Sequence, residues 1–156
     1  MMPRLDLHFL IVATLSLLLG VLLGIWMGVM HDFEFASVHV HITLLGWASL
    51  ALFGLTYRSY PEMGQSRIAT LHFVLATSSG VLFPLGISLS IIGITQSVAV
   101  FCAFIWLASV VLFLTNLLRI ALAGPTEPLR TSIPSLGASS PAPGAVRGFS
   151  QWRESL

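Results

Sequence analysis

The sequence predicts an all-α membrane protein in which four transmembrane helices form an up-down bundle. Three observations predict this fold class: few charges, four long apolar runs, and short connections between the runs. Only 8% of the 156 residues are charged and 56% are hydrophobic, whereas soluble domains carry about 25% charged residues. A soluble fold of this size cannot bury so much apolar surface. The expected surrounding is therefore a lipid bilayer.

Each of the four apolar runs is long enough to cross a bilayer, whose hydrocarbon core needs roughly 20 residues of helix. Backbone polar groups find no water inside that core, so each run should be helical. Short connections favour antiparallel neighbours and hence the up-down arrangement. The predicted membrane domain covers residues 1–122, with spans at about 7–30, 38–57, 68–94 and 98–122.

Residues 123–156 differ in composition from the rest of the chain. The stretch GPTEPLRTSIPSLGASSPAPGAVRG is rich in Pro, Ser, Gly and Ala. It lacks the apolar periodicity that a packed fold needs. We therefore expect a disordered tail after the fourth helix.

The basic residues predict the orientation of the chain in the membrane. All seven are arginines, and in a four-span arrangement they fall on one side. The positive-inside rule makes that side cytoplasmic, so both termini and the tail are expected there. The formal net charge of +1 offers no basic face for phosphates, so no nucleic-acid partner is expected. The arginines are Arg4, Arg58, Arg67, Arg119, Arg130, Arg147 and Arg153.

Five histidines are the informative feature of so apolar a chain. Ionisable side chains are costly at membrane depth, and histidine is the commonest metal ligand and a ligand of haem iron. His31, His39 and His41 fall at the outer ends of the first two helices. This clustering makes them candidate ligands of a metal ion.

The spacing of His39 and His41 leaves two geometries open. On a helix, residues two apart point to nearly opposite faces, whereas in an extended segment they share a face. The helical geometry gives the two histidines different roles and places His39 on one face with Gly46 and Gly54. The extended geometry lets them chelate one ion. Because HxH is a short motif, histidines that cap the helix or bond lipid headgroups are the structural alternative.

Gly20, Gly24 and Gly28 form a stripe along the first helix, and His31 follows on the same face. Such stripes let another backbone approach closely. Plain helix packing is the expected role of the glycines. The alternatives are room for a flat macrocycle and the contact surface of a homodimer.

His72 lies near the start of the third helix, at the head of a face of small and polar residues. Such a face indicates either a tight helix contact or the wall of a cofactor site. The segment from His41 to Tyr57 measures about 24 Å at 1.5 Å per residue. His72 is therefore too far from His39 or His41 to share one haem iron with either.

The stretch HDFEFASVHVHITLLGWASLALFGLTYRSYPE resembles short bacterial membrane proteins related to subunit I of haem-copper (cytochrome c) oxidases. The resemblance covers residues 4–122. Its matching features are His31-Asp32, the His39-Val40-His41 motif before Leu45-Gly46-Trp47, Tyr57-Arg58 with Pro61, and His72-Phe73.

In complete oxidase subunits, a histidine near the outer end of an early helix ligates the low-spin haem. The resemblance implies this role for His39 or His41, and it implies the bacterial inner membrane as the location. The later helices that supply further haem and copper ligands have no counterpart among the four spans. The resemblance therefore implies haem or metal binding and no oxygen-reducing site.

The histidine cluster and the resemblance together favour a small redox-associated protein that binds haem b or copper and is linked to respiratory electron transfer. His39, His41 and His72 are the candidate cofactor ligands, and His31, His39 and His41 the candidate metal ligands. No catalytic motif is recognisable, so enzymatic activity stays open. The alternatives are a non-catalytic structural or assembly partner of a respiratory complex and a small metal or solute channel.

Overall fold

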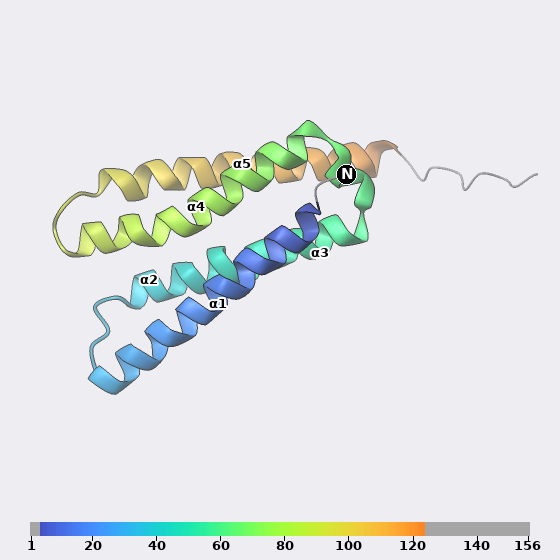
Figure 1. The fold of residues 1–156 in the computed structure, drawn as a ribbon. Helices are drawn as coiled ribbons and strands as arrows, with labels where there is room; N and C mark the ends of the chain where they lie inside the picture. Colours follow the sequence, from blue (N-terminus) through green and yellow to red (C-terminus); the bar gives the residue numbers. More distant parts are fainter. Residues whose placement is uncertain (1–3, 124–156) are drawn as a thin grey trace, which may run out of the picture. The chain divides into compact units, whose positions relative to one another are not determined.

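The structure, a computed structural model, describes residues 4–123, and within that range it consists of helices and short connections (Figure 1). Four helical segments are long and apolar enough to cross a membrane, which confirms the all-α class with four spans. These segments are Leu5–Met30, Ala36–Ser59, Arg67–Ile91 and Ser97–Leu122. The predicted disordered tail lies outside the described residues, apart from Ala123 at the end of the last helix.

The first span is the single helix α1. The second is a continuous segment in which a π-helical stretch, η1, separates two α-helical parts, α2 and α3. A short 3-10 helix, η2, then leads into the third span, α4, and the fourth span is α5. The bounds are α1 (Leu5–Met30), α2 (Ala36–His41), η1 (Ile42–Ser49), α3 (Leu50–Ser59), η2 (Pro61–Gln65), α4 (Arg67–Ile91) and α5 (Ser97–Ala123).

The helix ends follow local backbone chemistry. His31 ends α1 in the left-handed conformation, with φ of 55°, a region that histidine enters more readily than most residues. Ser66 caps α4, because its hydroxyl accepts a hydrogen bond from the Ala69 amide at 3.2 Å. Gly93, with φ of 76°, lies in the turn after α4. The third span therefore ends at Ile91, before the predicted residue 94.

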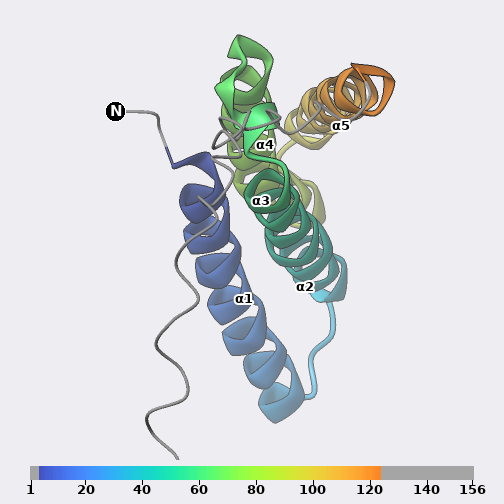
Figure 2. The same cartoon turned by 90° about the vertical axis from the view of Figure 1, so that its right-hand side faces the viewer.

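The spans form two helical hairpins. In the first, α1 packs along α2, η1 and α3, and in the second α4 packs along α5 (Figures 1 and 2). α4 also contacts α1, α2, η1 and α3, so it joins the hairpins. Most of the apolar side chains along the spans are exposed, as expected for a multi-pass membrane protein whose outer surface faces lipid.

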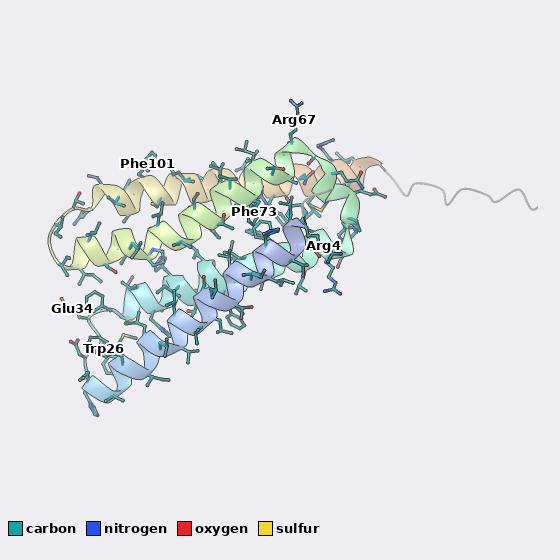
Figure 3. All side chains as sticks on the ribbon, viewed as in Figure 1. Arg4, Trp26, Glu34, Arg67, Phe73 and Phe101 are labelled. Carbon is teal, nitrogen blue, oxygen red and sulfur yellow. The ribbon has the colours of Figure 1, made fainter. Side chains whose placement is uncertain are left out.

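The two ends of the molecule differ in charge. We call the end at which α1 begins the arginine end, and the opposite end, where α1 joins α2 and α4 joins α5, the loop end. Arg4 and Arg67 lie at the arginine end, whereas Trp26 and Glu34 lie at the loop end (Figure 3). Arg58 and Arg119, near the ends of α3 and α5, also belong to the arginine end.

The packed core lies in the half of the molecule near the arginine end. Phe9 of α1 is completely buried; its ring stacks on Tyr57 at 5.6 Å between centroids and meets Phe73 edge-on at 4.9 Å. Phe113 of α5 reaches Phe53 at 4.5 Å. Because lipid is as apolar as these side chains, their contribution is close van der Waals packing. The core residues are Leu5, Phe9, Ala13, Leu50, Phe53, Tyr57, Met63, Ala69 and Ala76.

One buried amide ties η2 to the fourth span. Asn116 is 2% exposed, and its side-chain N–H donates to the backbone carbonyl of Met63 at 3.1 Å. The Ser66 hydroxyl donates more weakly to the Asn116 amide oxygen, at 3.5 Å. The amide thus satisfies a carbonyl of a segment that lies outside the long helices.

Replacing Asn116 with Ala should lower the stability of the protein, because the Met63 carbonyl would lose one of its two donors and keep the Ser66 hydroxyl, at 3.2 Å. The expected cost is about 0.5–1.5 kcal/mol for the lost hydrogen bond, measured as a fall in the unfolding midpoint in detergent. Thr115→Ala is the matched control, since the Thr115 hydroxyl is exposed and bonds only to Val111 of its own helix. Equal midpoints for the two variants would contradict the assigned role.

Candidate functional site

His39 is held between the first two spans. Its ring nitrogen Nδ1 donates to the backbone carbonyl of Gly20 in α1, at 2.9 Å. A carbonyl oxygen can only accept, so the ring proton lies on Nδ1, and in the neutral ring Nε2 keeps a free lone pair. The ring is partly exposed. His39 therefore presents an oriented nitrogen that can accept a proton or bind a metal.

His41 makes a different set of contacts. Its Nδ1 donates to the Ser37 carbonyl in the same helix at 2.7 Å, and its ring meets Phe83 of α4 edge-on at 5.0 Å between centroids. Residues 36–41 are helical, so the helical one of the two predicted geometries is present. His39 faces α1 and His41 faces α4, and the two rings do not chelate one ion together.

His31 ends α1 and is exposed, and its Nδ1 bonds to the Val29 carbonyl at 3.2 Å. Within residues 4–123, no three His, Cys, Asp or Glu side chains are grouped as a metal ion would need. One chain thus does not assemble the candidate metal ligands His31, His39 and His41 into one site. A site that uses one of them, or that combines two chains, stays a prediction.

The glycine stripe of α1 is occupied by the second span. An idealised Cβ at Gly20 would lie 2.8 Å from Cγ2 of Thr43, and one at Gly24 would lie 3.0 Å from Cε1 of His39. At Gly28 the space is open. The side chains of Thr43 and His39 fill the space that a macrocycle would need, so Gly20 and Gly24 serve helix packing within the chain.

His72 forms a second polar centre, inside the core near the arginine end. It is completely buried, and its Nδ1 and the Tyr57 hydroxyl are hydrogen-bonded at 3.0 Å. The other ring nitrogen, Nε2, has no hydrogen-bond partner in the described residues. An unpaired buried polar atom is unusual and is often linked to function.

Four aromatic rings enclose His72. Their centroids lie 4.7 Å (Phe53), 5.3 Å (Phe113), 5.4 Å (Phe9) and 5.8 Å (Tyr57) from that of the imidazole. A haem on Nε2 would have to displace these rings, so the predicted cofactor role of His72 requires a rearranged core. The sequence reasoning missed this cage. The signal for it was the polar Tyr57 within an apolar span.

A pocket at the arginine end was also missed. It measures about 360 Å³, and Arg4 and Arg58 line it from the first and second spans. The sequence reasoning used both arginines for orientation alone. Arg4 precedes the first span and Arg58 ends the second, and the ends of two neighbouring antiparallel helices lie close together. This was the signal that the two arginines could line one pocket.

Comparison of the chain with protein-family models, with curated proteins and with solved structures gave no match. The resemblance to subunit I of haem-copper oxidases therefore stays a prediction made from the sequence motifs. The histidine contacts are the observations from which a function can be argued.

Gly24→Ala should destabilise the contact between the first two spans, because the new methyl group would press on the His39 ring. Overpacking of this kind costs about 1–3 kcal/mol. Gly28→Ala is the matched control, since it meets open space and alanine is the better helix former. Thermal unfolding in detergent should show a lower midpoint for the first variant and an equal or higher one for the second. Equal decreases in the midpoints of the two variants would show that the His39 ring does not pack against Gly24.

A double-mutant cycle should reveal the Tyr57–His72 hydrogen bond. His72→Phe takes the imidazole partner from the buried Tyr57 hydroxyl, and Tyr57→Phe leaves both imidazole nitrogens unpaired, at about 1–3 kcal/mol each. The double variant removes both polar members of the pair, so its loss should be smaller than the sum of the single losses. Unfolding free energies in mixed micelles measure the coupling, and additive losses would contradict it.

Proposed function

We propose that this protein is a small redox-associated membrane protein that binds a copper ion or haem b through His39. The observation that carries the proposal is the hydrogen bond from His39 Nδ1 to the Gly20 carbonyl. Ligand histidines in metalloproteins almost always donate their other ring N–H to a carbonyl, a carboxylate or water. That bond fixes the tautomer and the ring orientation, and it leaves Nε2 for the metal.

The surroundings of His39 favour a copper ion over haem b. An idealised Cβ at Gly24 would lie 3.8 Å from Nε2, so α1 runs close beside this nitrogen. A single ion needs little room there, whereas a macrocycle needs a free plane around the iron. Imidazole suits copper well. A second copy of the chain, approached through the open surface at Gly28, is the source we propose for further ligands, with its His41 among them.

The orientation and location belong to the same proposal. The described arginines gather at the end opposite His39, and the positive-inside rule then puts His39 on the outer side of the membrane. The motifs that resemble subunit I of haem-copper oxidases support a bacterial inner membrane and a link to respiratory electron transfer.

A structural role is the second candidate, as a non-catalytic or assembly partner of a respiratory complex. It is favoured by the way the histidines join spans: His39 bonds α2 to α1, and His72 bonds α4 to α3 through Tyr57. In this role His39→Ala lowers stability and changes no cofactor content, because the unchanged protein binds none.

Metal analysis and a reduced-minus-oxidised spectrum of the purified protein test the proposal. We expect bound copper, or a haem Soret band, and a loss of affinity of about tenfold or more in His39→Ala. His8→Ala is the matched control, because His8 is exposed and its Nδ1, like that of His39, donates to a backbone carbonyl, that of Arg4, at 2.7 Å. The His8→Ala variant should bind copper or haem with the same affinity as the unchanged protein.

Two outcomes would overturn the proposal. The first is unchanged protein that, after copper or haem is added, holds neither. The second is equal affinity in His39→Ala and in the unchanged protein. The unfolding midpoint of each variant, measured alongside, separates loss of a ligand from loss of the fold.

A further inference from the structure

The pocket at the arginine end combines cationic, polar and apolar walls. Its volume is about 360 Å³, and it lies where the start of α1, the end of α3 and the helix η2 meet. Two guanidinium groups, those of Arg4 and Arg58, line it together with one carboxylate, that of Asp6. The other lining residues are Leu5, Tyr57, Pro61, Gly64 and Gln65.

This chemistry fits a phosphate group. Arginine presents a planar fork of N–H donors that matches the oxygens of phosphate, often in pairs of parallel hydrogen bonds. Two arginines against one aspartate leave the pocket with a net positive charge. The amide of Gln65 adds a neutral donor to the same wall.

The location of the pocket points to lipid as the source of that phosphate. α1 begins at Leu5 and α3 ends at Ser59, so the pocket lies at the ends of two membrane spans, at headgroup depth. Basic pockets at such depth bind anionic lipid headgroups. Leu55 precedes Arg58 by one helical turn, on the same face, and is 50% exposed. An acyl chain can therefore run along apolar side chains below a phosphate held by Arg58.

We propose that this pocket binds the phosphate of an anionic phospholipid, with Arg4 and Arg58 as its ligands. The site is separate from the His39 site and does not depend on the function proposed for it. Bound lipid would join α1 to α3 at the arginine end, next to the Tyr57 side chain that holds His72.

Two charge-matched double variants test the proposal in the full-length protein. Arg4→Gln with Arg58→Gln removes both proposed ligands. Arg67→Gln with Arg119→Gln removes the same charge from the same end, and neither of these arginines lines the pocket. Native mass spectrometry from detergent measures how much phosphatidylglycerol, phosphatidylcholine or inorganic phosphate each protein retains.

We expect the unchanged protein and the Arg67/Arg119 variant to retain phosphatidylglycerol in preference to phosphatidylcholine. The Arg4/Arg58 variant should lose about tenfold or more of that retention. Equal losses in the two double variants would overturn the site, because they would reflect net charge alone. Equal retention of the two lipids would overturn the anionic preference, and inorganic phosphate that displaces phosphatidylglycerol completely would overturn the lipid assignment.

A single variant that should increase lipid retention, rather than decrease it, covers the case in which the double variant fails to fold. Asp6→Asn removes the carboxylate that repels a phosphate in the pocket, so it should raise the retention of phosphatidylglycerol. Unchanged or reduced retention in this variant, with an unfolding midpoint equal to that of the unchanged protein, would contradict the proposal.

Discussion

The close approach of α1 to the second span is the contact on which the rest of the structure depends. Idealised Cβ atoms would lie 2.8 Å from Ser16 Oγ at Gly46 and 3.0 Å from the Asp6 carbonyl oxygen at Gly54, and Gly20 and Gly24 are equally crowded. A larger side chain at any of these four positions would therefore push the two spans apart or displace its neighbours. In lipid, helices associate through such close packing rather than through a hydrophobic driving force, so these glycines hold the first hairpin together.

Both proposed sites are consequences of this contact. At the loop end it brings the His39 ring to the Gly20 carbonyl, which orients the ring and frees Nε2. At the arginine end it places Arg4 beside Arg58, one from each span, around a common pocket. A shift of α1 along its neighbour would separate both pairs, so the two sites share one structural support although they bind different chemical groups.

α4 contributes the buried polar chemistry. The hydroxyls of Thr77, Ser78 and Ser88 bond to carbonyls of the same helix, which satisfies them without a partner from another span. His72 differs, because it depends on Tyr57 of α3 for its single hydrogen bond. Among the described residues, its Nε2 and the hydroxyl of Ser109 are the buried side-chain atoms without a partner. The core therefore retains an ionisable group at some cost in stability.

The sequence by itself determined the four spans and the separation of the arginines from His31, His39 and His41. These depend on local quantities: the length of an apolar run and the position of a charge. The sequence left two geometries open for His39 and His41, and the helix over residues 36–41 decided between them. Only the tertiary structure decided what each histidine contacts, namely α1 for His39, Phe83 for His41 and Tyr57 for His72. The physical reason is that neighbours are chosen by how whole helices pack, and no local periodicity in an all-apolar span records that choice.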